Sequence, residues 1–342
     1  MLLGFAITEH CNLRCPHCIR DDVTTVRSLD VSFVTSVLDQ ALAIFPEVTV
    51  SLTGGEPLIH PKFDDIVREL AERGIGYRFV SNGWHMRRIA RLLNEHAPQA
   101  VRLSLSGATA VVHDAERGRG SFRRVLEAVA ILTSRRVFVA LSLVVDKRDR
   151  DQLGTAVDLA ASLGVPRLQF ILPQPVPSSI ARGSDLAPHD WYEVRREVER
   201  LASGAIPRLR ITLDYGAPFD GDEHLCEAMR LERLYVNARG QLSVCCQLSE
   251  YGFTSTDVVA DLKQETLDSA WVKCQARLAT LREATWGVEP ADEFDRLPCI
   301  RCARVSHKLH WLDAFPGSAW NSAARHSSLV PGPSGRHLPL ST

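Results

Sequence analysis

The run from Cys11 to Cys18 reads CNLRCPHC, and its cysteines Cys11, Cys15 and Cys18 have the spacing C-x3-C-x2-C. Three thiolates on one short loop can bind three irons of a [4Fe-4S] cluster and leave the fourth iron without a protein ligand. The fourth iron is free to bind a ligand from outside the protein, so the spacing indicates a reactive iron–sulfur site. The alternatives are a zinc site with His17 as fourth ligand and three unrelated cysteines, although the paired spacings of common zinc sites are absent.

The last third of the chain carries a second group of four cysteines. Two of them flank a predicted hairpin, and two form a C-x2-C pair after a predicted helix. They are Cys226, Cys245, Cys299 and Cys302. Four thiolates leave no open position, which suits a fully ligated [4Fe-4S] cluster or a structural zinc ion. Cys246 and Cys274 remain, and the simplest interpretation makes both of them small buried hydrophobic residues.

These nine cysteines stand in an otherwise ordinary chain of 342 residues. The chain has 40 Lys and Arg and 41 Asp and Glu, and the resulting net charge of −1 argues against a dedicated binder of nucleic acid or of an anionic membrane. Its 45% of hydrophobic residues is typical of a globular protein, and no apolar run approaches the roughly 18 residues of a membrane-spanning helix. An odd number of cysteines favours metal or redox chemistry in the cytoplasm over a disulfide framework.

The first 172 residues alternate predicted strands with amphipathic helices, and this alternation would position the cysteine loop. Six strands are predicted, at 3–8, 48–52, 77–81, 101–106, 137–145 and 167–172. From the second onward they start 29, 24, 36 and 30 residues apart, which suits βαβ units and a parallel sheet. Six units are too few for a closed eight-stranded barrel. We therefore predict an α/β fold, a partial (βα)6 TIM-like barrel whose βα loops carry function.

A second signal follows the strand predicted at 48–52, which runs into Thr53, Gly54, Gly55, Glu56 and Pro57. Two glycines let the backbone approach a ligand closely, and a carboxylate follows at the carboxyl end of the strand. Taken alone, these residues fit an ordinary turn. Together with the cysteine loop they indicate one shared site, because βα loops at the carboxyl ends of strands carry function in such folds.

With CNLRCPHC and GGEP in this order, the chain closely resembles the radical S-adenosylmethionine (SAM) superfamily. The resemblance implies that Cys11, Cys15 and Cys18 ligate a [4Fe-4S] cluster and that the amine and carboxylate of SAM chelate its open iron. It also implies that the GGEP turn binds the SAM amino group. One electron from the cluster would then cleave SAM to methionine and a 5′-deoxyadenosyl radical.

Three further residues match the family in order and are implied to contact SAM. Asn82 follows the third predicted strand, Ser104 lies in the fourth, and Arg117 comes after it. Ser104 and Arg117 also fit a simple strand end and a solvated helix charge. Two positions depart from the family pattern: Ser106 stands where relatives usually have Asp, and His17 stands where an aromatic residue is more usual.

After residue 172 the pattern changes. The predicted elements are a loop at 173–184, a helix at 191–201, a strand at 209–213, a hairpin of 234–237 with 242–246, and a helix near 267–281. This part resembles the auxiliary-cluster extension of radical SAM enzymes, called SPASM in its longer form and twitch in its shorter form. No cysteine follows Cys302, so the resemblance favours the twitch form with one auxiliary [4Fe-4S] cluster. We predict a barrel domain over 1–205, a cluster-binding α+β domain over 206–312 and a weakly ordered tail over 313–342.

The resemblance implies an oxidoreductase or related radical enzyme that abstracts hydrogen from carbon. One possible substrate is a small molecule, such as a sugar or aminocyclitol, that is oxidised or epimerised. The other is a ribosomally made peptide that gains a thioether, a carbon–carbon cross-link or an epimer, with leader recognition by a separate protein because the barrel starts at residue 3.

Cys246 and Cys274 are candidate hydrogen donors to a substrate radical. The expected partner is an external electron donor such as flavodoxin or ferredoxin, and we expect no nucleic acid and no membrane. The remaining alternative is a zinc-binding or redox-sensing protein without enzymatic activity.

Overall fold

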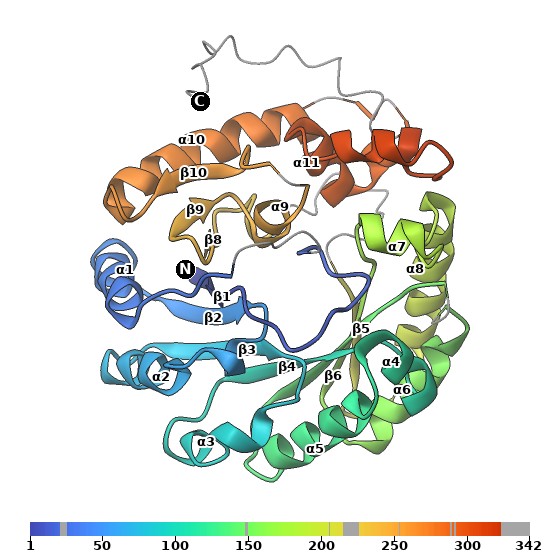
Figure 1. Ribbon diagram of the computed structural model, residues 1–342, viewed down its shortest axis with the longest axis horizontal. Helices are drawn as coiled ribbons and strands as arrows, with labels where there is room; N and C mark the ends of the chain where they lie inside the picture. The colour runs from blue at the N-terminus through green and yellow to red at the C-terminus, as the bar shows by residue number, and fades with distance from the viewer. Residues whose placement is uncertain are drawn as a thin grey trace.

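The computed structural model describes residues 1–20, 26–147, 150–204, 206–214, 226–252, 254–287, 289–290 and 292–322. Its centre is a ten-stranded sheet in the order β10-β9-β8-β1-β2-β3-β4-β5-β6-β7, which curves into an open barrel (Figure 1). The neighbouring strands from β8 through β1 to β7 are all parallel. These strands are β1 Leu2–Thr8, β2 Thr49–Gly54, β3 Gly76–Ser81, β4 Ala100–Leu105, β5 Val139–Val144, β6 Arg167–Ile171, β7 Arg210–Leu213 and β8 Arg233–Val236.

Helices cover the outside of this barrel (Figure 1). They are α1 Val31–Ile44, α2 Phe63–Glu72, α3 Leu92–Glu95, α4 Ala110–Arg117, α5 Ser121–Thr133, α6 Leu153–Ser162, α7 Pro177–Ala181 and α8 Pro188–Ser203. The α2 helix shows why they pack there: Phe63, Ile66, Val67 and Leu70 lie on one face and are fully buried against the sheet. In β3 and β4 every second residue is buried and the others are half-buried, so the barrel interior is less tightly filled than the layer beneath the helices.

The predicted α/β partial barrel is confirmed, and all six predicted strands are present as β1 to β6. The parallel sheet is wider than the six predicted units, because β7 joins one edge and β8 pairs with β1. Leu2 of β1 lies opposite Arg233 of β8 and Phe5 lies opposite Val236. The hairpin predicted near residue 234 therefore continues the barrel sheet and does not form a separate one.

The elements after β8 cover one side of the barrel. They are β9 Gln241–Ser243, α9 Cys246–Glu250, β10 Val258–Asp261, α10 Leu267–Trp286 and α11 Pro298–Val305. The second strand of the predicted hairpin is shorter than expected, because β9 ends at Ser243 and Cys245 caps α9. The buried ammonium of Lys308 pairs with the buried carboxylate of Asp257, which also accepts from Ser243, and these contacts link the segment after α11 to the start of β10 and to β9.

Two smaller expectations are corrected. The stretch predicted as loop at 173–184 contains α7. Pro177 favours a helix start there, because its fixed φ suits the first helical position. The predicted tail starts later than residue 313, since Trp320 is buried against Trp191 with ring centroids 5.4 Å apart. Residues 323–342 lie outside the described part of the chain. Among the described helices, none has the length and apolar character needed to cross a membrane.

Candidate active site

The cysteine loop begins where β1 ends and lies directly against the turn that follows β2. Gly54 has a φ of +132°, and a Cβ on it would lie 2.2 Å from the carbonyl oxygen of Thr8. A Cβ on Gly55 would lie 2.1 Å from the carbonyl oxygen of His10. The N–H groups of Gly55 and Glu56 donate to these same two oxygens, at 2.8 and 2.7 Å. The two glycines thus permit close contact between two segments of the protein itself.

The carboxylate of Glu56 is buried between the ends of β2 and β3, with 1% of the residue exposed. Ser81 Oγ and the N–H of Leu58 donate to its Oε1, at 2.8 and 3.2 Å, and the N–H of Asn82 donates to Oε2 at 2.7 Å. Burial raises the pKa of Glu56 to about 7, although these three donors act in the opposite direction. Such a carboxyl group favours a cationic ligand, because a nearby positive charge stabilises its ionised form.

Asn82 joins the end of β3 to the cysteine loop. Its Nδ2 donates to Oδ1 of Asn12 at 2.9 Å, and its Oδ1 accepts from the N–H of Trp84 at 2.9 Å. From the opposite side of the loop, Ser178 of α7 donates to the carbonyl oxygen of Pro16. The loop is therefore held by two elements that are far apart in the sequence.

Arg117 lies in the last turn of α4 and is only 8% exposed, so it is not a solvated helix charge. Its Nε donates to Oγ of Ser106 at 2.7 Å, and its Nη2 lies 3.4 Å from Nε2 of His17. Both departures from the family pattern therefore meet at one guanidinium. Ser106 gives this arginine a neutral hydrogen-bond acceptor, where an aspartate at the same position would provide a charged one. Ser104 lies two residues before Ser106 and is half-buried, and its side chain forms no hydrogen bond among the described residues.

The three cysteines of the loop are free thiols, with Cys11 exposed and the other two half-buried. The N–H of Cys18 donates to the carbonyl of Cys15 at 3.1 Å, and the N–H of Leu13 donates to Sγ of Cys11 at 3.5 Å. Burial raises the pKa of Cys18 above its usual value, and the adjacent Cys15 adds to this rise. A bound metal would reverse the effect, because coordination stabilises the thiolate.

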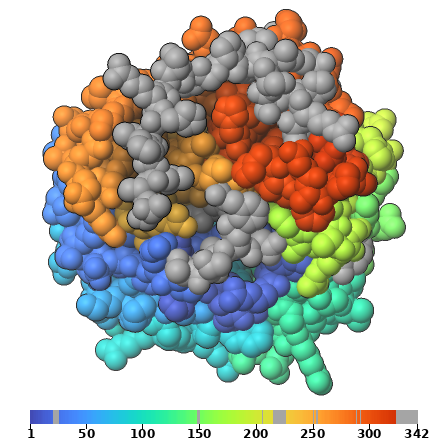
Figure 2. All heavy atoms as spheres, turned by 45° about the horizontal axis from the view of Figure 1, so that its top comes forward, coloured from blue at the N-terminus to red at the C-terminus, as the bar shows by residue number. Residues whose placement is uncertain are grey.

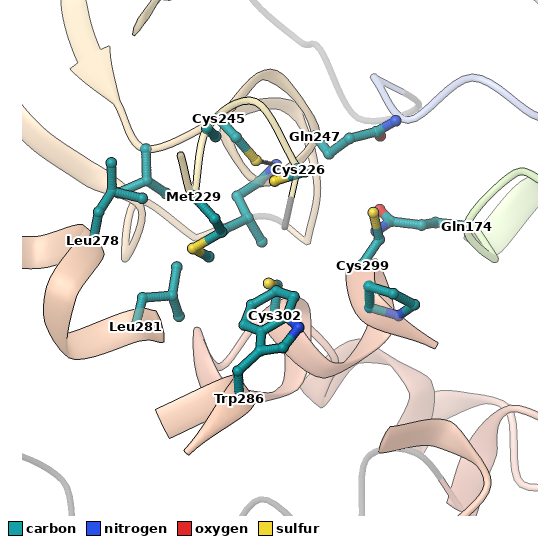
Figure 3. A pocket seen from close by; sticks show the side chains of 14 residues that line it. Gln174, Cys226, Met229, Cys245, Gln247, Leu278, Leu281, Trp286, Cys299 and Cys302 are labelled. Carbon is teal, nitrogen blue, oxygen red and sulfur yellow. Dashed lines mark hydrogen bonds between the residues drawn. The ribbon is translucent and has the colours of Figure 1, made fainter. Parts of the chain in front are cut away.

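The four C-terminal cysteines line one cavity between α9, α10 and α11 (Figure 3). The sulfur atoms of Cys226 and Cys245 lie on one side, and Cys299 and Cys302 extend toward them from α11. The latter two share a face of the helix because they are three residues apart. Burial raises the pKa of all four thiols, and repulsion by neighbouring cysteines adds to the rise at each of them. The structure thus brings together the cysteines that the sequence grouped.

The two remaining cysteines lie in different surroundings. Cys246 begins α9 and lines a cavity inside the barrel, whereas Cys274 is fully buried in α10. Cys245 and Cys246 face different cavities because a helix starts between them. Of the two candidate hydrogen donors, Cys246 is the one that shares a cavity with the cysteine loop.

The cavity inside the barrel holds about 330 Å³ of space and reaches from Cys18 in the cysteine loop toward the amino ends of the strands. Arginine side chains from β3, β4, β6 and β8 line it, namely Arg78, Arg102, Arg167 and Arg233. Our sequence interpretation did not single out these residues. The available signal was a basic residue between apolar ones at an early strand position, as in Tyr-Arg-Phe at 77–79 and Val-Arg-Leu at 101–103.

The donor groups can be compared with what a metal centre needs. Among the described residues, no three or more His, Cys, Asp or Glu side chains converge closely enough to hold a single metal ion. A [4Fe-4S] cluster makes a different demand, because each cysteine binds its own iron at a separate corner of a cube. Three thiols on the first loop and four around the C-terminal cavity match the chemistry of two such clusters.

Figure 2 shows the face on which the blue N-terminal segment, the yellow-green segment with α7 and the red segment with α11 meet. A parallel open barrel with a three-cysteine loop at its mouth and a second cysteine group beside it is the arrangement expected of a SAM-binding iron–sulfur protein. Comparison with known proteins gives the same result: residues 5–160 match the family model of the Radical SAM superfamily. The chain therefore contains a radical SAM domain, followed by an extension with cysteines.

Three relatives and one solved structure show the range of similar proteins. The chain is 32% identical over 165 residues to mycofactocin maturase MftC of Mycolicibacterium smegmatis, covering 47% of this chain and 42% of the relative. It is 28% identical over 209 residues to the AdoMet-dependent heme synthase of Methanosarcina barkeri, covering 57% and 59%. It is 29% identical over 168 residues to the PqqA peptide cyclase of Ruegeria pomeroyi, covering 48% and 44%.

The solved structure is that of anSMEcpe with bound AdoMet and the Cp18Cys peptide. It has a TM-score of 0.65 and 17% identity, and the alignment covers 95% of this chain and 98% of that one. At this identity the similarity establishes the fold. The chain spans between 42% and 59% of the length of the three sequence relatives.

Proposed function

We propose that this chain is a radical SAM enzyme that cleaves SAM reductively and abstracts hydrogen from a carbon atom of a peptide substrate. The observation that carries the proposal is the linkage of the cysteine loop to the strand ends. Glu56 N–H donates to His10, and Asn82 donates to Asn12, so the loop, the Gly-Gly-Glu-Pro turn and the end of β3 form one unit at the barrel mouth. In this unit Cys11, Cys15 and Cys18 would hold the SAM-binding [4Fe-4S] cluster.

When bound, the cluster supplies the electron that splits SAM into methionine and a 5′-deoxyadenosyl radical. The residues around it would bind and orient SAM. Glu56, buried and with its pKa raised to about 7, provides a carboxylate that the SAM ammonium would keep ionised. Gly54, Gly55 and Pro57 place that carboxylate beside the cysteine loop.

Asn82, Ser104 and Arg117 would complete the SAM site from β3, β4 and α4. The guanidinium of Arg117 is fixed through Nε by Ser106, and this hydrogen bond holds it at the edge of the cysteine loop. An arginine in that position suits the SAM carboxylate, because the guanidinium fork matches carboxylate geometry.

The C-terminal cysteines Cys226, Cys245, Cys299 and Cys302 would hold one auxiliary [4Fe-4S] cluster, as in a twitch-type extension. Support comes from their shared cavity and from thiol pKa values raised by burial, since four buried neutral thiols gain a strong reason to ionise only when metal binds. We place the boundary between the barrel and this extension near residues 205 and 206, and the end of the extension beyond residue 312, because Trp320 is still buried.

A peptide is the substrate class that the relatives favour. One relative is named a peptide cyclase, the anSMEcpe structure contains a bound peptide, and MftC is named a maturase. A carboxyl-bearing small molecule is the second candidate, because the heme synthase relative has a different kind of product and the barrel cavity is rich in arginine. In either case Cys246 is the better placed hydrogen donor, since Cys274 is buried in α10.

An external electron donor such as flavodoxin or ferredoxin would supply the electron. All nine cysteines are free thiols, which suits the reducing cytoplasm.

The test is anaerobic reconstitution with iron and sulfide, followed by reduction in the presence of SAM. We expect about eight irons per chain and formation of 5′-deoxyadenosine. Cys15→Ser and Cys302→Ser should each remove about four irons, and Cys15→Ser should also abolish 5′-deoxyadenosine. Cys274→Ser is the matched control for iron content, because its thiol lies outside both cysteine groups.

Several outcomes would contradict parts of the proposal. A chain that binds about one zinc per cysteine group and no iron would support the structural alternative. About four irons in the unaltered chain would remove the auxiliary cluster.

A further inference from the structure

The barrel cavity has a strong local charge in a chain whose net charge is −1. Five arginines line it, and its described lining residues include no Asp and no Glu. The arginines are Arg20, Arg78, Arg102, Arg167 and Arg233. The interior of a closed TIM barrel is usually filled with bulky branched side chains, and here the lining positions also include Gly4, Ser51, Ala100 and Ala140. The small residues leave space, and the arginines give that space its charge.

The strand register explains why these arginines come together. Arg78 of β3 lies opposite Ala100 of β4, Arg102 opposite Ala140 of β5, and Arg167 opposite that same Ala140 from the other side. Each of these three arginines is thus flanked across the sheet by an alanine. Long side chains that start from neighbouring strands can therefore extend into the same interior space without colliding with a large neighbour.

Two of the arginines lack a partner that would neutralise them. Within the described part of the chain, the side chain of Arg102 forms no hydrogen bond and no ion pair. The Nε of Arg167 is buried without a hydrogen bond among the described residues, and its guanidinium lies 5.6 Å from the centre of the Phe138 ring. By contrast, Arg233 is paired with Glu227 at 2.8 Å.

Burial lowers the pKa of Arg102, and the nearby Arg233 and Arg78 lower it further. An arginine guanidinium nevertheless stays protonated in proteins, so the folded chain keeps the unfavourable energy of burying Arg102 beside two other positive charges. Two nearby groups, Cys246 and Asp214, raise the pKa of Arg102 instead. A ligand with negative charge would relieve the repulsion.

We propose that the barrel cavity binds a carboxylate group of the substrate, held chiefly by Arg102 and Arg167. This proposal rests on the proposed function and specifies its substrate class. The same cavity is bordered by Cys18 and Gly54, so a carboxylate bound at the arginines would anchor the substrate beneath the cysteine loop. Two planar guanidinium groups offer the paired N–H donors that bind a carboxylate through both oxygens.

The carboxylate has two possible sources, namely an acidic side chain or C-terminus of a peptide and a small organic acid. Isothermal titration of the reconstituted full chain, without SAM or reductant, distinguishes them with three probes: tetraglutamate, tetraglutamine and citrate. We expect tetraglutamate to bind saturably and tetraglutamine not to bind. Citrate binding without tetraglutamate binding would assign the site to a small acid.

Variants identify the residues responsible. Arg102→Gln and Arg167→Gln should each weaken binding of the acidic probe at least about tenfold, since each removes one charged pair of hydrogen bonds. Arg102→Lys keeps the charge and should lose less, which also guards against a folding defect in the glutamine variant. The matched control is Arg123→Gln on the outside of α5, where 73% of the side chain is exposed, and it should bind as the unaltered chain does.

The proposal is overturned if neither acidic probe binds, if tetraglutamine binds as well as tetraglutamate, or if both glutamine variants bind normally. Because no SAM cleavage is involved, a chain that binds carboxylate but forms no 5′-deoxyadenosine would contradict the proposed function alone. A chain that forms 5′-deoxyadenosine but fails the binding test would contradict the carboxylate site alone.

Discussion

Replacing Glu56 with glutamine tests whether the carboxyl group between β2 and β3 is as strongly desolvated as its surroundings indicate. Burial raises its pKa to about 7, against an ordinary value of 4.5. Between these two pH values the folded chain holds a proton that the unfolded chain has released. Stability from this group is therefore complete below pH 4.5 and is lost as the pH rises through about 7.

The size of the effect follows from the gap between the two pKa values. Each pKa unit corresponds to about 1.4 kcal/mol, so the free energy of unfolding should fall by about 3 kcal/mol between pH 4.5 and pH 8 because of Glu56. Glutamine does not titrate. Any constant change that the amide makes to the contacts with Ser81 and Asn82 is the same at every pH and cancels in the comparison.

The measurement is guanidinium chloride unfolding of the unaltered chain and of Glu56→Gln at several values between pH 5 and pH 8, both without cofactors. The stability of the variant relative to the unaltered chain should rise by about 2.5 kcal/mol across this range. Glu72→Gln, on the exposed end of α2, is the control for a carboxylate in water. A difference that stays flat, or that changes in the opposite direction, would show that the three hydrogen-bond donors outweigh burial and would refute the assigned pKa.

Two further changes test contacts that hold the site. Gly55→Ala should destabilise the chain by about 2 kcal/mol and lower the iron bound by the first loop, because its Cβ would lie 2.1 Å from the His10 carbonyl oxygen. The control is Gly154→Ala in α6, where the space is open, and it should change neither stability nor iron content in this way. Normal iron content in Gly55→Ala would contradict the reasoning. Lys308→Met should cost about 3 to 5 kcal/mol in denaturant unfolding, because it leaves the buried Asp257 carboxylate unpaired. Adding Asp257→Asn should recover part of that loss, and an equal loss in the double variant would show that packing, not charge, is responsible.

The barrel was predictable because its information is local. Each of β1 to β6 is an apolar run followed by a turn or helix, and the spacing between them is that of βαβ units. The cysteine loop and the Gly-Gly-Glu-Pro turn were likewise visible as short runs. Their mutual position could be inferred, because both follow parallel strands.

What the sequence concealed depends on contacts between distant segments. No local pattern shows that β8 pairs with β1, because the strands are separated by more than two hundred residues. The contact between Gly55 and His10 was hidden for the same reason, since the two residues belong to different segments. The arginines of the barrel interior become a group only when strand register brings them together.

The pairing of β8 with β1 has a consequence for synthesis of the chain. Leu2 leaves the ribosome about 230 residues ahead of its neighbour Arg233, which corresponds to roughly 10 to 50 s of translation. During this time one edge of β1 has no neighbour from β8, and an open strand edge can pair with other chains. The strand that leads into the cysteine loop thus acquires its second neighbour only after β8 has been made, so the barrel sheet stays incomplete until then.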